Sequence, residues 1–284
     1  MNKILSLLTF AFSIVILFSC EPNRDTNGDY LIGVNQSGGT TGGTGGGTGG
    51  GTTGRLLKKI ISHEKNDETG LFEDTEMTFN YTGNKLISTK DDRGEITTFS
   101  YNANGKMDKI VATGQLTTFE YNNNNVSKTV TEIAGVAKLT GNFSYVAGKL
   151  TKTISIQEYT LPIPIKNYVE TTYEYQGANI SKGIIKAGIY LPNGNLEMNP
   201  ESTVIDFTYD QKISPYSLLP KEFAFYVSGI APQGVAFFSG NNLTKYVITV
   251  GGMPEIVNYS YEYDTAGYAS KMVEGEDYTK YEYQ

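Results

Sequence analysis

The chain has 284 residues, of which 23 are Lys or Arg and 30 are Asp or Glu, so its formal net charge is −7. Phosphate backbones and anionic lipid surfaces repel a chain of this charge. We therefore expect no nucleic acid partner, and we expect any membrane contact to come from a lipid group rather than from a basic patch. Cys20 is the only cysteine, which excludes an intramolecular disulfide.

Residues 1–20 are predicted to be a signal peptide. Lys3 precedes an uncharged, mostly apolar run from Ile4 to Phe18, which is shorter than the roughly 20 residues of a membrane-spanning helix. The run ends in Leu17-Phe18-Ser19-Cys20, which resembles the lipobox of bacterial lipoproteins. The resemblance implies that Cys20 carries a lipid that anchors the protein in the cell envelope, where we expect the outer membrane and leave the leaflet open. An ordinary signal or a short anchor is the alternative.

Residues 21–54 are predicted to form a flexible tether. Ser37 to Gly54 consists of eleven Gly, six Thr and one Ser, so it has no side chains to bury. As a flexible coil these 18 residues span about 23 Å on average. A phosphate-binding glycine loop needs a strand before it, a helix after it and, in one class, a Lys-Ser/Thr pair. None of these is present, so we assign no nucleotide and no other cofactor.

The rest of the chain, residues 55–284, repeats one short motif, an aromatic residue two positions before a tyrosine. The residue between the two aromatics is polar in every copy, so the aromatics share one face of a strand and the other face is wet. In the first three copies the second aromatics, Tyr81, Tyr101 and Tyr121, lie 20 residues apart, and most later copies are more widely spaced. The eight copies are Phe79-Asn80-Tyr81, Phe99-Ser100-Tyr101, Phe119-Glu120-Tyr121, Phe143-Ser144-Tyr145, Tyr173-Glu174-Tyr175, Phe207-Thr208-Tyr209, Tyr261-Glu262-Tyr263 and Tyr281-Glu282-Tyr283.

In several copies the motif is followed by a turn containing Gly or Asn and then by an apolar-x-Lys pair. Tyr101, for example, leads through Asn104-Gly105 to Met107-Asp108-Lys109. This order predicts β-hairpins. The fold is therefore expected to be all-β, an antiparallel meander of repeated hairpins that is curled or closed into a barrel-like sheet with its aromatic face inward.

Three finer expectations follow from the repeat. The Lys of each apolar-x-Lys pair should share a face with its apolar partner and extend its stem over that face. The tyrosine hydroxyls should reach water at the rim of the sheet. Helix is expected only near Ser214 to Ser228, where Pro215 and Pro220 could each begin a short turn.

The repeat resembles the tyrosine-aspartate (YD) repeats of the RHS type. The best matches are FSYNANGKMDKI (99–110), FNYTGNKLIS (79–88) and YEYDTAGYASK (261–271), with Asn usually in place of the Asp. Large RHS proteins close such repeats into a shell around a toxin, for which this chain is far too short. It more closely resembles small repeat-bearing lipoproteins of unknown function, and this resemblance implies an antiparallel, barrel-like sheet.

Catalytic chemistry has little support in the residues. His63, the only histidine, follows the expected first strand from Leu56 to Ser62 and is expected to be a solvated edge residue. Triad hydrolysis needs a partnered histidine, and zinc sites usually need several N or S ligands. The carboxylates of the first hairpin do not match a calcium loop and are expected to be solvated. We therefore assign no catalytic residue and no metal site; these carboxylates are Asp67, Glu68, Glu73, Asp74 and Glu76.

The segment from Gln211 to Asn242 interrupts the repeat and is rich in aromatic residues. A non-repeat insertion on a regular scaffold can carry a binding surface for a glycan or protein partner. It can equally be a plug that covers an open end of the sheet, which is the interpretation that we favour. The candidate binding residues are Tyr216, Phe223, Phe225, Tyr226, Phe237 and Phe238.

The sequence thus predicts a lipid-anchored protein of the cell envelope that is not an enzyme and serves as a binding or structural module. One alternative is a β-barrel that carries a small apolar ligand. Another is a carboxylate-based glycan hydrolase. Such an enzyme needs two carboxyl groups close together, and the sequence does not show which of the 30 acidic residues would form that pair. A transmembrane barrel is a structural rival that would turn the aromatic face toward lipid.

Overall fold

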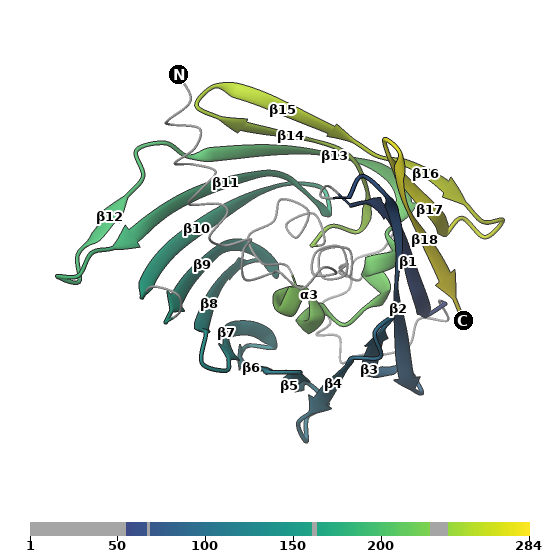
Figure 1. Ribbon diagram of the computed structural model, residues 1–284, viewed down its shortest axis with the longest axis horizontal. Coiled ribbons are helices and arrows are strands. Elements are labelled where there is room, and N and C mark those ends of the chain that lie inside the picture. Colours follow the sequence, from purple (N-terminus) through teal and green to yellow (C-terminus); the bar gives the residue numbers. More distant parts are fainter. Residues whose placement is uncertain (1–54, 67–68, 161–163, 228–237) are drawn as a thin grey trace.

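The computed structural model describes residues 55–66, 69–160, 164–227 and 238–284. Its strands form one 18-stranded sheet in which each pair of neighbours is antiparallel. The sheet curls into a nearly closed barrel around a short helix, α3, which lies near the centre of the ring in Figure 1. The prediction of an all-β antiparallel meander with a barrel-like shape is confirmed.

The elements follow one another along the chain with short turns, apart from the insertion between β13 and β14. They are β1 (Leu57–Lys65), β2 (Phe72–Thr82), β3 (Lys85–Asp91), β4 (Ile96–Tyr101), β5 (Met107–Ala112), β6 (Gln115–Asn122), β7 (Asn125–Ile133), β8 (Ala137–Val146), β9 (Lys149–Tyr159), β10 (Ile165–Gln176), β11 (Asn179–Tyr190), β12 (Leu196–Met198), β13 (Thr203–Ile213), the 3-10 helix η1 (Pro215–Leu218), α3 (Lys221–Val227), β14 (Asn241–Val250), β15 (Met253–Asn258), β16 (Ser260–Tyr263), β17 (Ala269–Glu274) and β18 (Asp277–Tyr283).

The first and last strands close the ring. β1 pairs with β2 on one side and with β18 on the other, and Leu56 and Gln284 exchange backbone hydrogen bonds of 3.0 and 2.9 Å. The pairing of the ring is irregular between β14 and β17, and this stretch is called the seam. There β15 pairs with β14, the chain continues through Tyr259, and β16 pairs with β17. The Tyr259 amide donates to the Thr244 carbonyl at 2.8 Å, which ties the seam to β14.

The aromatic face points into the barrel, as predicted. Phe79, Phe99 and Phe119 are buried, and all eight polar residues between the paired aromatics are exposed. This is the pattern that strand alternation dictates when only one face of a sheet is packed. The aromatic face is therefore not turned outward, as the transmembrane alternative required.

A β-bulge recurs at the second tyrosine of the motif and overturns the expectation for the lysines. In the β4–β5 hairpin Tyr101 pairs with Met107 but Ser100 pairs with Lys109, so one residue is left over. The extra residue moves Lys109 to the exposed face of Ser100, away from the face of Met107. The same register shift places Lys128, Lys152, Lys182 and Lys245 opposite the outward residues Glu120, Ser144, Glu174 and Thr208.

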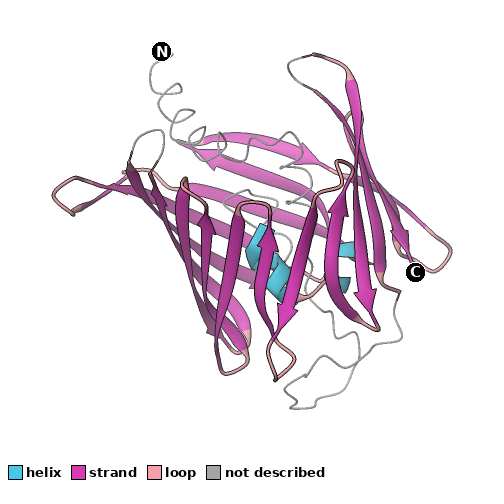
Figure 2. Ribbon diagram, turned by 60° about the horizontal axis from the view of Figure 1, so that its bottom comes forward, coloured by secondary structure: helices cyan, strands magenta, loops and turns pink. Residues whose placement is uncertain are grey.

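The insertion contains the helices in the expected place. The Ser214 hydroxyl caps η1 by accepting from the Tyr216 amide at 3.3 Å, and Pro215 is the first residue of that turn. Pro220 directly precedes α3. Both helices lie inside the wall of strands (Figure 2). No helix in the described ranges is long and apolar enough to cross a membrane.

Because hairpins alternate in direction, the barrel has two distinct rims. The tether rim consists of the connections after β2, β4, β6, β8, β10, β13 and β16, together with Arg55 and Gln284. The far rim consists of the connections after β1, β3, β5, β7, β9, β11, β12, β14 and β17. The chain therefore enters the barrel from residues 1–54 at the rim that also carries the insertion.

Candidate functional site: the tyrosine belt and the plug

A belt of tyrosines lines the inside of the barrel next to the tether rim. Its members are the second aromatics of the repeated motif, each at a bulge: Tyr81, Tyr101, Tyr121, Tyr145, Tyr175, Tyr209, Tyr263 and Tyr283. Their hydroxyls were expected to reach water, and this was wrong for several of them. The Tyr81 hydroxyl donates to the Leu57 carbonyl at 2.9 Å, and the Tyr101 hydroxyl donates to the Leu86 carbonyl at 2.7 Å.

Each of these bonds joins a strand to the strand before it in the chain: β2 to β1, and β4 to β3. The acceptors Leu57 and Leu86 are fully buried, so each tyrosine hydroxyl donates to a carbonyl that water does not reach. Burial, and next the charge of Glu222, raise the pKa of Tyr101 to about 12, so the hydroxyl remains a donor even above pH 10. The belt is therefore a structural ladder of donors rather than a set of wet phenols.

Lysines of the tether rim cover the belt. The Nζ atoms of Lys85, Lys106 and Lys149 lie 5.1, 4.7 and 5.0 Å from the ring centroids of Tyr101, Tyr121 and Tyr175 respectively. These are cation–π distances. Lys106 also donates to Oδ1 of Asn124 at 2.7 Å, and Lys149 donates to the Gly177 carbonyl at 2.6 Å. Each of these two lysines thus links its own turn to the next turn along the rim.

The plug, defined as η1 and α3, fills the barrel beside the belt. Phe223 of α3 is 1% exposed and packs edge-to-face against Phe79 and Phe99, with ring centroids 6.4 and 5.4 Å apart. The Tyr121 hydroxyl lies 2.9 Å from Oε1 of Glu222 in addition to its contact with the Met107 carbonyl. Aromatic packing and a charged hydrogen bond therefore both attach α3 to the wall.

Three further aromatic contacts hold the insertion in place. The ring of Phe225 lies 4.3 Å from that of Phe143 and 5.2 Å from that of Phe238. The hydroxyls of Tyr216 and Tyr281 are 3.0 Å apart, and their rings are nearly perpendicular. The insertion is consequently bonded to strands on opposite sides of the ring.

The structure brings the candidate residues of the insertion together inside the barrel. Tyr216, Phe223 and Phe238 are buried, while Phe225 and Tyr226 are half-buried against the core. Their packing is that of a plug, and a role in binding remains a prediction. Phe237 and the lipidation residue Cys20 lie outside the described residues.

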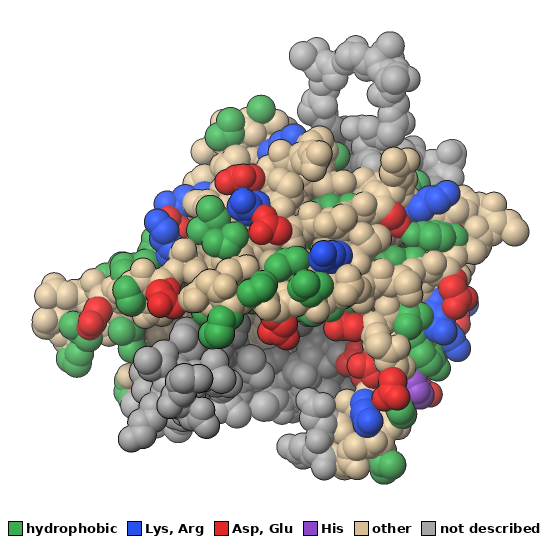
Figure 3. Space-filling view, turned by 90° about the horizontal axis from the view of Figure 1, so that it is seen from above, with side chains coloured by type: hydrophobic (Ala, Val, Ile, Leu, Met, Phe, Trp, Pro, Cys, Tyr) green, Lys and Arg blue, Asp and Glu red, His purple; other side chains and the backbone are tan. Residues whose placement is uncertain are grey.

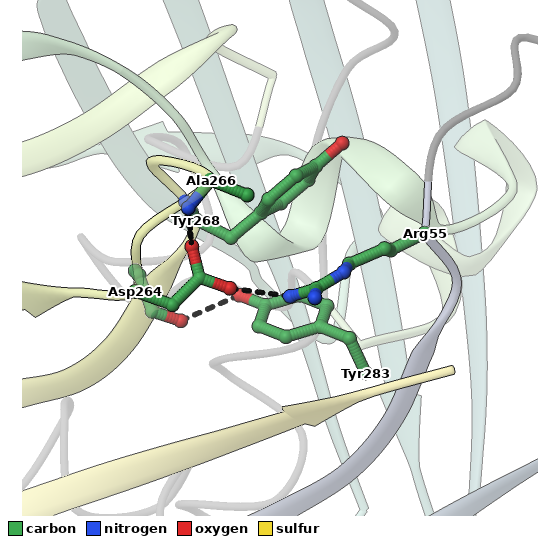
Figure 4. A network of polar contacts seen from close by, with 6 residues as sticks. Arg55, Asp264, Ala266, Tyr268 and Tyr283 are labelled. Atoms are coloured by element: carbon green, nitrogen blue, oxygen red, sulfur yellow. Dashed lines mark hydrogen bonds and ion pairs between the residues drawn. The ribbon is translucent and has the colours of Figure 1, made fainter.

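Two acidic residues that sequence reasoning did not single out organise the tether rim. Asp264 accepts from the amides of Ala266 and Tyr268, both at 2.9 Å, and pairs with the Arg55 guanidinium (Figure 4). Burial would raise the pKa of Asp264, but these amides and Arg55 hold it below its usual range. Figure 4 also shows Tyr283, the end of the last strand, beside this group. The ion pair therefore fastens the start of the barrel to its final turns.

Asp210 holds the seam in a similar way. It accepts from the Tyr263 hydroxyl, from the Asn242 side chain at 3.0 Å and from the Lys212 amide at 2.8 Å. The signal was present in the sequence, because Asp210 and Asp264 each directly follow the second tyrosine of a motif. They are the two copies of the motif in which an Asp directly follows the second tyrosine.

The barrel is similar to solved structures in fold. A porin-like protein from Bacteroides vulgatus ATCC 8482 matches with a TM-score of 0.53 and 10% identity, over 81% of this chain and 99% of that chain. A porin-like protein from Bacteroides uniformis ATCC 8492 matches with a TM-score of 0.49 and 13% identity, over 80% and 96%. No protein-family profile and no curated protein matches the chain. At this identity the first match shows a shared barrel architecture and nothing finer.

His63 does not sit where the sequence placed it. It lies within β1 rather than after the first strand, and its ring is stacked between Phe72 and Tyr278 at 4.8 and 4.5 Å. Its Nδ1 is 2.7 Å from Oδ1 of Asp74. The expectation of a solvated edge histidine is therefore wrong, because cross-strand neighbours on both sides supply aromatic faces.

The acidic residues of the first hairpin are dispersed among separate partners. Asp74 contacts His63, Glu73 accepts from Asn66 at 2.9 Å, and Glu76 pairs with Lys59 at 2.8 Å. Asp67 and Glu68 lie outside the described residues. Across the described part of the chain, no three His, Cys, Asp or Glu side chains are grouped so that they could hold a metal ion.

The outer wall of the barrel carries cross-strand ion pairs between its outward-facing residues. Examples are Lys128–Glu120 at 2.7 Å and Lys152–Glu170 at 2.6 Å. On the face seen in Figure 3, apolar, basic and acidic side chains are interspersed. Lipid-facing walls carry a continuous apolar band instead.

Proposed function

We propose that this chain is a lipid-anchored barrel of the cell envelope that acts as a non-enzymatic binding or structural module and does not conduct solutes. The observation that carries the proposal is the filled interior. Phe223, Leu219 and Ala224 of the insertion are each no more than 1% exposed, inside a ring that would otherwise enclose a lumen. A conducting barrel needs an aqueous channel along its axis.

The envelope location draws on two independent supports. The lipobox-like sequence ending in Cys20 would attach the chain to a membrane through lipid. The shared architecture with a porin-like bacterial protein favours the same compartment. The charged outer wall fits a barrel held beside the membrane by its tether better than one inserted across it.

The two alternative functions have weaker support. A carrier of a small apolar ligand would need the space that Phe223 and Phe225 occupy. A glycan hydrolase would need a free acid and a free carboxylate. The insertion's Glu222 and the seam's Asp210 are instead each bonded to a tyrosine hydroxyl.

Ion conductance across a planar bilayer tests the pore question. The purified full chain should give no conductance steps, whereas a general porin measured in parallel should give them. Reproducible unitary steps from the wild-type chain would refute the proposal that the filled barrel is closed.

Metabolic labelling tests the anchor. Cells that express the full chain should incorporate radiolabelled palmitate into it, and the Cys20→Ala variant should incorporate none. Equal labelling of the two chains would show that Cys20 is not the lipid-bearing residue.

A further inference from the structure

The barrel separates its charges between its two rims, which the total charge of the chain conceals. Each rim comprises its connections and the two strand residues on either side of each connection, within the described ranges. The tether rim then holds seven basic and five acidic residues, and the far rim holds five basic and twelve acidic residues. The barrel is therefore an electric dipole whose positive end is the rim where the chain enters.

The excess cations of the tether rim are accessible. Its basic residues are Arg55, Lys58, Lys85, Lys106, Lys149, Lys212 and Lys221. All of them except Lys106 are exposed. Lys106 and Lys149 bind neutral oxygens and tyrosine rings, so those contacts orient their charges without cancelling them. Among the acidic residues, Glu222 turns inward to Tyr121 and Asp264 is paired with Arg55.

We propose that the tether rim docks on an anionic phospholipid surface, with the far rim pointing away from the membrane. This inference rests on the proposed lipid anchor and adds an orientation to it. The predicted tether joins the barrel at Arg55, on the basic rim, so the anchor and the cations face the same surface. The sequence predicts that Ser37 to Gly54 behave as a flexible coil spanning about 23 Å, a length that would let the rim reach the headgroups.

Screening by salt limits how far the charges of each rim interact with a membrane surface. The 8 residues of β6 span roughly 26 Å, and a typical strand tilt leaves roughly 20 Å between the rims along the axis. The Debye length is about 8 Å at physiological ionic strength. A surface that touches the tether rim is therefore largely screened from the carboxylates of the far rim. At this range the charge of the rim that touches the membrane, rather than the total charge of the chain, determines the interaction.

Fluorescence quenching by labelled headgroups measures the orientation. The full chain is reconstituted into vesicles of phosphatidylcholine alone, or of equal parts phosphatidylglycerol and phosphatidylcholine, each with a trace of headgroup-labelled quencher lipid. One dye is attached through Asn104→Cys in a tether-rim turn, and a matched dye through Asp92→Cys in a far-rim turn. The dye should not react with an acylated Cys20, so labelling of the unsubstituted chain reports separately on the anchor.

The expected result is stronger quenching at position 104 in phosphatidylglycerol vesicles than in phosphatidylcholine vesicles, and loss of this increment in about 1 M salt, where the Debye length is about 3 Å. Position 92 should show no such increment. Equal quenching of position 104 in the two lipid mixtures, in chains that remain bound to vesicles, overturns the docking. Chains that do not bind vesicles at all overturn the anchor instead.

Charge variants identify the surface. Replacing Lys85, Lys106 and Lys149 together by Gln should abolish the increment, and replacing them by Arg should restore it. The matched control removes three lysines from the barrel wall (Lys128, Lys152 and Lys182, each to Gln) and should keep the increment, since those side chains pair with wall carboxylates or lie beside them. An increment that survives in the rim Gln variant, or that is lost equally in the wall variant, refutes the assignment to the tether rim.

Discussion

Replacing Phe223 with Ala should lower the free energy of unfolding by about 3–5 kcal/mol, through lost burial and the cavity left behind. The ring is 1% exposed and meets the edges of Phe79 and Phe99. Aromatic pairs of this geometry are worth about 0.5–1.5 kcal/mol each beyond their buried area, which places this site at the upper end of the range. A loss of this size is a large part of the roughly 5–15 kcal/mol that stabilises a typical domain.

Urea unfolding of the full chain, followed by circular dichroism, measures the effect. The midpoint should fall while the slope with denaturant stays the same, since the folded and unfolded states expose similar areas in both proteins. A double-mutant cycle with Phe99→Ala should give a coupling energy of about 0.5–1.5 kcal/mol, because the two rings are in direct contact.

The matched control is the same chemical change on the outer surface. Phe72 is 42% exposed, so Phe72→Ala should cost about 1 kcal/mol, mostly from its stacking on His63. If Phe223→Ala were no more costly than Phe72→Ala, or if Phe223 and Phe99 were uncoupled, the plug would not be packed inside the barrel. The proposal of a filled, non-conducting interior would then lose its main support.

Three further predictions concern the belt and its turns. Tyr101→Phe should cost about 1–3 kcal/mol, because the buried Leu86 carbonyl loses its donor; an unchanged urea midpoint would show that water replaces the hydroxyl. Gly105→Val should cost about 1–3 kcal/mol because φ at this turn is +75°, whereas Gly105→Asn should cost less, and equal melting temperatures for the two variants would contradict this. Burial, then Glu222, raise the pKa of Tyr101 from 10.0 to about 12, so its contribution to stability is complete below about pH 10 and is lost as the pH rises toward 12. The urea midpoint should therefore fall between about pH 10 and pH 12, and less so in Tyr101→Phe; a midpoint that rises over this range would contradict the sign.

Much of the barrel could be predicted from residue order because its repeat is local. Two aromatics separated by one polar residue specify a strand with one packed face, and the positive φ of Asn123 and Asn124 fits the turn that their Asn-rich sequence predicts. Two prolines placed the helices of the insertion. These inferences needed only strand alternation and turn chemistry, which act over a few residues.

The faces of the lysines and the partners of the tyrosines could not be predicted in this way. One extra residue at the bulge turns Lys109 outward, although simple alternation places it beside Met107. The Tyr101 hydroxyl finds its acceptor on the preceding hairpin, at a residue fixed by strand register rather than by spacing. His63 was misplaced for the same reason, since both stacking rings belong to neighbouring strands.

The sequence by itself determined the strands, the inward aromatic face, the position of the helices and the motif that predicts a lipid at Cys20, because each depends on neighbours in the chain. Closure of the sheet decided the rest. It brought Leu56 against Gln284, enclosed the insertion as a plug, and set Arg55 against Asp264. It also collected basic turns at one rim and acidic turns at the other, since alternate hairpins point in opposite directions and only a closed ring gathers their tips into two separate surfaces.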